Sequence, residues 1–529
     1  IITTTRHLDW DSLGWFPLTV GVFKREQSIA LLCGRTGDTD RDAADQIADT
    51  LGDLPVAVSQ AAATAKWGDY TLSEYLERLS NHPLESSISR LEGDDYPDAV
   101  GVALFMAYEQ ALEQIRSKHP QQERIAISLL DSLSLLAASG VPTHWLLGLD
   151  DDSDAVRDTL SFLKRSSILQ ESTDGNKTII HRLQGQVYRE SYLNNQEELD
   201  KASTHVTTTL NGISVNQFNS FEQQRQEIRN LIEQFHSITS QKYSHPLFSV
   251  PVFVSMLATT LRHATDLGMP QLALTLTESV TQAGDTLGPD HSDTLASRNN
   301  LATAYQDAGR LDEAIPLYER IFDDVMRVLG PDDPGILASR LKLADAYRDA
   351  SRLDDAIALY KRTLQDSARI LGRHHPRTLA SRNHLAGTCR EVGRLDEAIP
   401  LYEQYLEDLT RILGPDQPDT LTSRSSLAGA YQDAGRLHEA IPLFEQNLDG
   451  RTRVLGPDHP GTLASRHSLA GAYQAAGRLH EAIPLYEQNL DDFTHLLGPD
   501  HPDTFTSRST LAGAYQAAGR LHEAIPLYE

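Results

Sequence analysis

The apolar positions in the second half of the chain recur at a fixed spacing of 42 residues, as between Leu287 and Leu329. Both leucines open the turn sequence Leu-Gly-Pro-Asp, which also starts at Leu413, Leu455 and Leu497, and the variant Leu-Gly-Arg-His starts at Leu371. A period of this length, kept without insertion to the end of the chain, predicts an array of stacked helical repeats.

Each repeat is expected to hold two antiparallel helices. In one repeat the first helix should start at Asp293-Thr294 and end at Gly309, because glycine tolerates the left-handed conformation of a C-terminal cap. The second helix is expected from Leu311 to the turn at Gly330. Alanines and tyrosines at helical spacing form the packing faces, so stacked repeats bury a continuous core.

Residues 1–250 lack this period and predict a different architecture. Short β-rich runs are expected at 1–6 and 18–23, and helices at about 26–36, 40–51, 99–115, 124–138 and 153–165. The turn Asp174-Gly175-Asn176 predicts a hairpin between 168–170 and 178–180. Three helices followed by a hairpin outline a winged helix, after which polar helices are expected from 195 to 245.

Composition narrows the classes of function. The 529 residues carry a formal net charge of −27, which argues against general binding to nucleic acid or anionic membranes, because those need clustered Lys and Arg. The only two cysteines, Cys33 and Cys389, are far apart and predict neither a disulfide framework nor a zinc site. No run of about 18 apolar residues could span a bilayer. A cytoplasmic location is therefore expected.

The repeats resemble the tetratricopeptide repeat, and their Leu-Gly-Pro-Asp-His-Pro connector is similar to that of kinesin light chain. The resemblance covers roughly residues 245–529, with a degenerate first unit at about 250–287. It implies a right-handed α-α superhelix that binds a protein or peptide in a groove lined by the first helix of each repeat. The groove residues it implies are Asn299, Gln306, Arg348, Asn383, Arg390, Gln432, His467, Gln474 and Gln516.

Three recurring residue types leave alternatives open. Glycine interrupts the first helix at groove positions Gly387, Gly429, Gly471 and Gly513, which suggests close approach of either a ligand or the neighbouring helix. Six arginines, from Arg298 to Arg508, recur with acidic residues from Glu313 to Glu523. They could grip an acidic peptide, although an internal ion-pair ladder is favoured. His438, His480 and His522 are too far apart to share one metal, so no metal site is expected.

The front of the chain is similar to the distal half of the NB-ARC module of signal-transducing ATPases with numerous domains. The strand that ends at Arg6 matches the sensor strand, whose arginine approaches the nucleotide γ-phosphate in that family. Gly52, Leu54, Pro55 and Val56 match the Gly-Leu-Pro-Leu motif that packs on adenine, with Asp53 inserted and Val56 in place of leucine. His181 follows the hairpin, where the family contacts the β-phosphate of ADP. A purely structural histidine is the alternative.

The predicted fold is mainly α, with a partial NB-ARC helical region and a winged helix followed by the repeat superhelix. Its expected parts are a distal NB-ARC segment at 1–85, a winged-helix domain at 90–195, a helical linker at 196–248 and repeats at 249–529, the last one truncated. The sequence has no phosphate-binding Gly-Lys-Ser/Thr loop. We expect a fragment that binds nucleotide weakly, from a cytoplasmic and bacterial parent that is a slow ATPase using ADP or ATP with Mg²⁺.

The predicted function is a nucleotide-dependent switch whose repeats sense a protein or peptide partner, with possible self-assembly of the parent. The alternative is a repeat scaffold without nucleotide control. A transcription factor is a third reading. It is disfavoured because the expected helix at 153–165 sets Arg157, Lys164 and Arg165 against Asp154 and Asp158, too little positive charge to contact phosphates.

Overall fold

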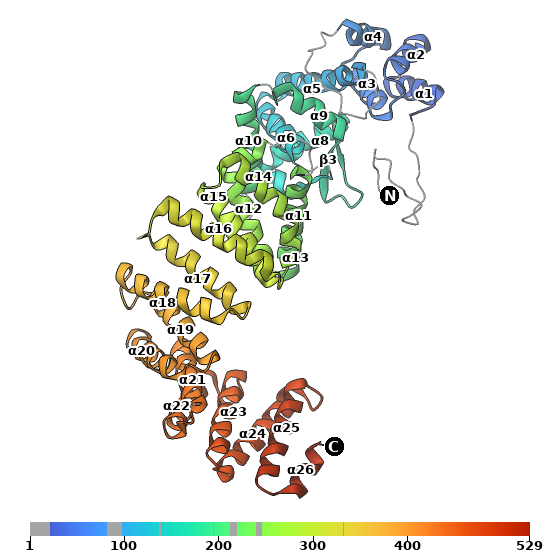
Figure 1. Cartoon of the computed structure of the whole chain (residues 1–529). Coiled ribbons are helices and arrows are strands. Elements are labelled where there is room, and N and C mark those ends of the chain that lie inside the picture. The colour runs from blue at the N-terminus through green and yellow to red at the C-terminus, as the bar shows by residue number, and fades with distance from the viewer. Residues whose placement is uncertain are drawn as a thin grey trace. The chain divides into compact units, whose positions relative to one another are not determined.

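The computed structural model describes residues 22–81, 98–136, 139–193, 195–211, 220–239, 246–331 and 333–528 (Figure 1). The chain divides into two compact units, Ile1–Gly309 and Arg310–Glu529.

The first unit begins with a small helical cluster, made of α1 (Arg25–Thr36), α2 (Arg41–Thr50), α3 (Pro55–Trp67) and α4 (Leu72–Asn81). These helices bury Leu32, Ile47 and Val58 completely, in one core with residues of α5 (Asp98–Lys118). The polar residues before the helices set where they start. The side chain of Asp40 accepts a hydrogen bond from the Ala43 amide at the start of α2. Thr71 and Glu74 form a reciprocal capping pair at the start of α4.

A helical layer with a small sheet follows, and it contains α6 (Glu123–Leu135), α7 (Thr143–Leu146), α8 (Ser153–Arg165) and α9 (Arg182–Leu193). The strands β1 (Val141–Pro142), β2 (Leu169–Glu171) and β3 (Lys177–Ile180) form an antiparallel sheet in the order β1-β3-β2. The predicted helices and hairpin are therefore present. The short strand β1 was not predicted, and α6 ends earlier than expected.

The first unit ends with helices that lead into the repeats. They are α10 (Gln196–Asn211), α11 (Phe221–Thr239), α12 (Pro251–Asp266), α13 (Pro270–Ala273), α14 (Thr277–Leu287) and α15 (Ser292–Asp307). Helix α12 ends near Gly268, which has a φ of +70°. Helix α14 ends at Leu287, so this segment repeats the two-helix pattern in the degenerate form expected from the sequence.

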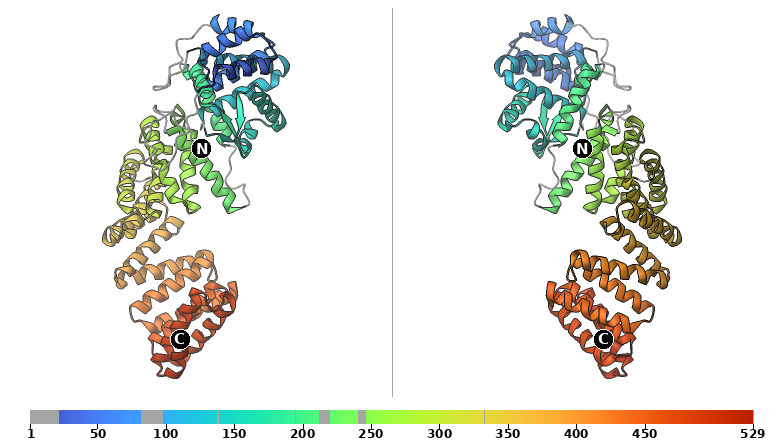
Figure 2. Two further views of the ribbon diagram at one scale, coloured as in Figure 1. Left: turned by 90° about the vertical axis from the view of Figure 1, so that its right-hand side faces the viewer. Right: turned by 90° about the vertical axis from the view of Figure 1, so that its left-hand side faces the viewer.

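The second unit is a regular series of helix pairs (Figure 2). It contains α16 (Leu311–Leu329), α17 (Pro334–Asp349), α18 (Leu353–Ile370), α19 (Pro376–Glu391), α20 (Leu395–Leu413), α21 (Pro418–Asp433), α22 (Leu437–Leu455), α23 (Pro460–Ala475), α24 (Leu479–Leu497), α25 (Pro502–Ala517) and α26 (Leu521–Tyr528). We call the odd-numbered helices of this series, and α15, helix A, and the even-numbered ones helix B. The mainly helical fold class is confirmed.

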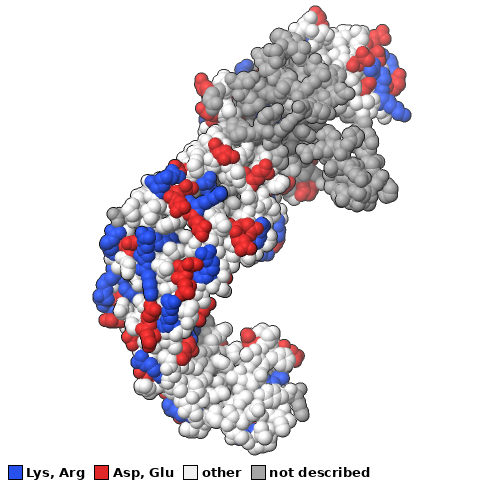
Figure 3. Space-filling model, viewed as in Figure 1, with Lys and Arg blue, Asp and Glu red and all other residues white. Residues whose placement is uncertain are grey.

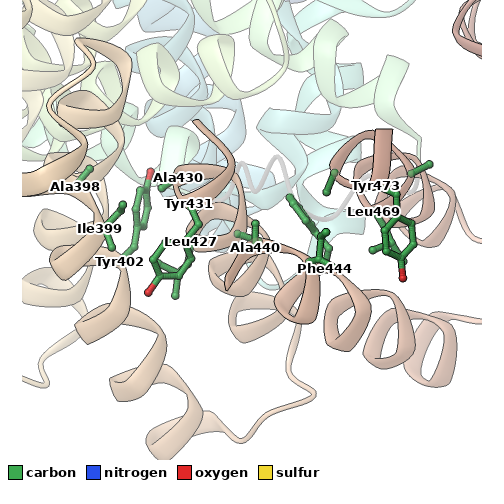
Figure 4. Packing of buried hydrophobic residues seen from close by; sticks show 14 of the residues in the cluster. Ala398, Ile399, Tyr402, Leu427, Ala430, Tyr431, Ala440, Phe444, Leu469 and Tyr473 are labelled. Atoms are coloured by element: carbon green, nitrogen blue, oxygen red, sulfur yellow. The ribbon is translucent and has the colours of Figure 1, made fainter. Parts of the chain in front are cut away.

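One continuous core runs through the second unit from α17 to α26. Helix A contributes Ala428 and Ala430, helix B contributes Ala440, and all three are fully buried. Tyr402 and Phe444 of helix B pack in the same row (Figure 4). Since each helix pair uses the same positions, every repeat buries its faces against its neighbours, as expected for a solenoid.

The predicted start of helix A is wrong by one or two residues. Helix α15 starts at Ser292, and α19, α23 and α25 start at the proline that precedes the predicted Thr. In these helices a histidine occupies the N-cap, and its Nδ1 accepts the amide hydrogen two residues ahead, as His459 does from Gly461 at 3.0 Å. The histidines of the connector therefore cap helices, an interaction that the sequence pattern did not reveal.

Candidate functional site: the helix-A face

The predicted groove positions lie on one stripe of each helix A, which we call the helix-A face. In the second unit it consists of positions spaced by four and three residues, which lie on the same side of a helix. Its members are Leu341, Asp345 and Arg348 on α17, Asn383, Gly387 and Arg390 on α19, Ser425, Gly429 and Gln432 on α21, His467, Gly471 and Gln474 on α23, and Ser509, Gly513 and Gln516 on α25. All are half-buried or exposed. Asn299 and Gln306 occupy the equivalent half-buried positions of α15.

The α17 end of this face is charged and internally paired. Oδ1 of Asp345 accepts a hydrogen bond from the Tyr360 hydroxyl at 2.5 Å and lies 2.9 Å from Nδ1 of His384. Burial raises the pKa of Asp345, but the bonds from His384 and Tyr360 outweigh it and hold that pKa below its usual value. Arg348 pairs with Asp349 at 3.1 Å. The charges at this end thus satisfy one another.

Arg390 covers the next part of the face. Its Nε donates to Oδ2 of Asp433 at 2.5 Å, which joins α19 to α21. A Cβ atom at Gly429 would lie 2.8 Å from Nη2 of Arg390, so any other residue here would require the Arg390 guanidinium to shift. At Gly429 the glycine therefore admits the side chain of the neighbouring helix, which was one of the two alternatives.

The α23 end of the face is neutral and uncovered. A Cβ atom at Gly471 would lie 3.6 Å from the Tyr486 hydroxyl, an ordinary contact, and one at Gly513 would meet nothing within 4 Å. The ring of His467 packs edge-on against Tyr486 with centroids 5.4 Å apart, and burial lowers the pKa of His467, which favours the neutral imidazole. The side of α23–α26 seen in Figure 3 carries few charges, whereas charges are dense over α16–α19.

The recurring arginines do not line this face. Arg340, Arg382 and Arg466 are buried, and each pairs with an aspartate of helix B in its own repeat, as in the 2.6 Å contact of Arg382 with Asp408. The prediction of internal ion pairs is therefore confirmed for these three arginines. The alternative, that they bind an acidic peptide, is wrong for them. The acidic series pairs elsewhere: Glu439, for example, bonds to Arg436 three residues before it.

The motif matched to adenine packing forms the turn before α3. Gly52 and Asp53 both have positive φ, of +61° and +54°. The Asp53 carboxylate accepts hydrogen bonds from Ser28 at 2.7 Å and from Arg25, so the inserted residue anchors this turn to α1. Leu54 and Pro55 are half-buried, and Pro55 is the first residue of α3. Both keep apolar surface that an adenine could cover.

His181 directly precedes α9, and its Nδ1 accepts the Leu183 amide hydrogen at 3.3 Å. His181 thus caps the start of α9, which is the structural role expected as the alternative to phosphate binding. Gln184 of α9 donates to the side chain of Gln60 on α3 at 2.8 Å. Helix α3, which begins at Pro55, and helix α9, which follows His181, are thus directly hydrogen-bonded. Arg6 lies outside the described residues.

Three further observations limit what the described residues can do. They contain no cluster of His, Cys, Asp and Glu that could hold a metal ion. In the same parts of the chain, no helix combines the length and apolar character needed to cross a membrane. On α8, Arg157 pairs with Asp154 and Lys164 with Glu171, so two of its three cations are already neutralised.

Comparison with known proteins agrees with the repeat architecture. The profile of the tetratricopeptide repeat matches residues 258–323, 293–365, 336–411, 378–437, 419–491 and 464–529. A crystal structure of nearly identical repeats from a putative kinesin light chain of Podosopora anserina is 35% identical, with a TM-score of 0.37, and the match covers 39% of this chain and 98% of that one. No curated protein sequence matches the chain.

Two further solved structures are similar at lower sequence identity. The crystal structure of BtubC from P. vanneervenii is 20% identical over 47% of this chain and 92% of that one, with a TM-score of 0.36. A signal transduction ATPase with numerous domains that carries a tetratricopeptide repeat sensor, from Pyrococcus horikoshii, is 13% identical. That match covers 96% of this chain and 72% of the other, with a TM-score of 0.41.

Proposed function

The chain belongs to the tetratricopeptide repeat family, and we propose that its repeats bind a protein or peptide partner along the helix-A face. The observation that carries the proposal is the uncovered α23–α25 part of that face, together with Gln432 near the end of α21. Gln432 and Gln474 are half-buried, Gln516 is exposed, and Gly471 and Gly513 leave helix backbone bare between them. Half-buried amides beside bare backbone suit hydrogen bonding to a peptide that lies across successive repeats.

A peptide selection tests this proposal. Random dodecapeptides displayed on phage are selected on the whole chain, and an enriched peptide is synthesised and titrated by calorimetry. The double variant Gln432→Ala, Gln474→Ala should weaken binding about tenfold or more, because each lost hydrogen bond costs about 0.5–1.5 kcal/mol. The matched control is Gln446→Ala, Gln488→Ala, which changes exposed glutamines of helix B in the same two repeats. Equal loss in both variants, or in neither, would contradict binding at the helix-A face.

We propose further that the front of the chain belongs to an ADP- or ATP-dependent switch in the parent protein. The hydrogen bond between Gln60 and Gln184 supports this, because it holds the turn at Gly52–Pro55 and the start of α9 at His181 within one bonded pair of helices. Leu54 and Pro55 would cover adenine and His181 would reach a phosphate. A partner on the repeats would then shift the switch by its difference in affinity for the two states.

Calorimetry with ADP on the parent chain, extended upstream, tests the switch. His181→Ala removes both the imidazole and the cap of α9, whereas His181→Asn keeps a capping side chain. Loss of ADP affinity in both variants supports a phosphate contact. Loss in the alanine variant alone would show that His181 acts only through the cap. Absence of ADP binding in the unmodified parent would leave the repeat scaffold without nucleotide control.

A further inference from the structure

Tyr486 of α24 points at Gly471 on the helix-A face. Tyr486 is only 3% exposed, yet its hydroxyl has no hydrogen-bond partner in the described part of the chain. Tyr486 therefore presents an unused donor beneath a position where helix A has no side chain.

The same position in other repeats shows what is missing. Three repeats earlier, Tyr360 donates its hydroxyl hydrogen to Asp345, which occupies on α17 the position that Gly471 occupies on α23. In α22 the equivalent residue is Phe444, beneath Gly429, and that site is covered by Arg390. Tyr402 lies beneath Gly387, with its hydroxyl 3.5 Å from the place of a Cβ atom there, but it interacts with Arg390, whereas the equivalent place near Tyr486 holds the uncharged Gln474. An acceptor supplied from outside would complete the bond that Asp345 completes for Tyr360.

The charges around the site decide the class of acceptor. Asp345 is accompanied by His384 at 2.9 Å and by Arg348, whose Nη1 lies 3.8 Å away. The residue equivalent to His384 is Thr510 on α25, and the residue equivalent to Arg348 is Gln474 on α23. Neither carries a charge. The Thr510 hydroxyl already donates to the Thr506 carbonyl. A carboxylate beside Tyr486 would have no cation to pair with, and burying an unpaired charge is costly. An uncharged carbonyl suffers no such penalty.

The fold itself does not need glycine at this position. Glycine in a helix interior costs about 0.5–1 kcal/mol relative to alanine, and a Cβ atom at Gly471 would make only an ordinary contact. The bare backbone lets another chain approach α23 closely. We propose that the Tyr486 hydroxyl binds a main-chain carbonyl of an uncharged, extended peptide segment that lies across Gly471. This proposal rests on the proposed function of the helix-A face and names the chemistry of its ligand.

The test uses peptides from the random dodecapeptide selection on the whole chain. Enriched peptides should lack Asp, Glu, Lys and Arg across the segment they share. Tyr486→Phe should weaken their binding about three- to tenfold, the value of one hydrogen bond, without lowering the urea midpoint, because Phe444 is native at this position. Gly471→Asp should abolish binding, since its carboxylate would take the hydroxyl as Asp345 does.

The control is Tyr473→Phe, which removes a hydroxyl of α23 that already donates to Glu445 at 2.6 Å. It should lower stability and leave affinity unchanged within about twofold. Peptides that lose affinity in the Gln432→Ala, Gln474→Ala variant but not in Tyr486→Phe or Gly471→Asp would overturn the inference and leave the helix-A face as the binding surface. Enriched peptides that share Asp or Glu in their common segment would also overturn the inference. If no peptide is enriched, the proposed function fails and the inference fails with it.

Discussion

Tyr431 donates its hydroxyl hydrogen to Oε1 of Glu403 at 2.5 Å, and so ties helix A of one repeat to helix B of the repeat before it. The same bond recurs from Tyr347 to Glu319, from Tyr473 to Glu445 and from Tyr515 to Glu487. The junction between α18 and α19 differs. There the two positions hold Lys361 and Cys389, and Lys361 pairs instead with Glu397 at 2.6 Å. At the junction before α15 only the glutamate is replaced, by Thr277, whose hydroxyl lies 3.2 Å from that of Tyr305.

Tyr431→Phe should lower the free energy of unfolding by about 1.5–3 kcal/mol, the usual value of a hydrogen bond to a charged group. The lower end is expected, since Glu403 is exposed to solvent. Urea unfolding followed by circular dichroism measures the loss. Tyr486→Phe is the matched control, because that hydroxyl has no partner among the described residues. An equal loss in the two variants would show that the bond to Glu403 contributes nothing specific.

The hydroxyls of these tyrosines should also ionise at a higher pH than that of an ordinary tyrosine. Burial first, and then the hydrogen bond to the glutamate, raises the pKa of Tyr347, Tyr431, Tyr473 and Tyr515 to about 12, from an ordinary value of 10.0. A pKa that is higher in the folded chain gives stability that is complete below pH 10 and is lost as the pH rises towards 12. Absorbance at about 295 nm against pH should show a late group of tyrosines. In the Tyr431→Phe variant that group should shrink. Coincident titration of all tyrosines near pH 10 in the folded chain would contradict this.

Substitution of Asp408 in its buried ion pair with Arg382 should strongly lower the free energy of unfolding. Asp408→Asn leaves the Arg382 guanidinium, whose side chain is 7% exposed, without its charged partner. Breaking one side of such a pair costs about 3–5 kcal/mol. Arg424 provides the comparison, because Gly450 occupies the place of the aspartate and, among the described residues, Arg424 donates to the Pro415 carbonyl at 3.2 Å and forms no ion pair. Arg424→Met should therefore cost much less in the same urea experiment. A larger loss of stability in Arg424→Met than in Asp408→Asn would show that the ion pair is not stabilising.

The histidine caps can be tested by two substitutions at one position. His459→Ala removes the acceptor for the Gly461 amide and should cost about 1 kcal/mol, as for other N-caps. His459→Asn restores a side-chain acceptor and should recover most of that loss. The melting temperatures of the two variants give the comparison. If asparagine is no better than alanine, the histidine stabilises the connector in some other way.

Sequence spacing was a good guide wherever one local rule decides the structure. The ends of helix A at glycine and the hairpin at Asp174-Gly175-Asn176 followed from turn chemistry. The start of helix A did not, because histidine is an uncommon cap and the expected Asp-Thr signal lies just inside the helix. The assignment of Arg6, Gly52, Leu54, Pro55 and His181 to a nucleotide came from resemblance alone and stays a prediction.

The sequence by itself determined the repeat period, the pairing of helices and the residues on the helix-A face, because an unbroken period forces each repeat to bury the same positions. Only the tertiary structure decided which of those positions remain available. Arg390 closes the face over Gly429, whereas no side chain closes it over Gly471. The partner of each buried arginine was likewise hidden, since Asp408 lies 26 residues from Arg382. Such contacts depend on distances between neighbouring helices, which linear spacing does not encode.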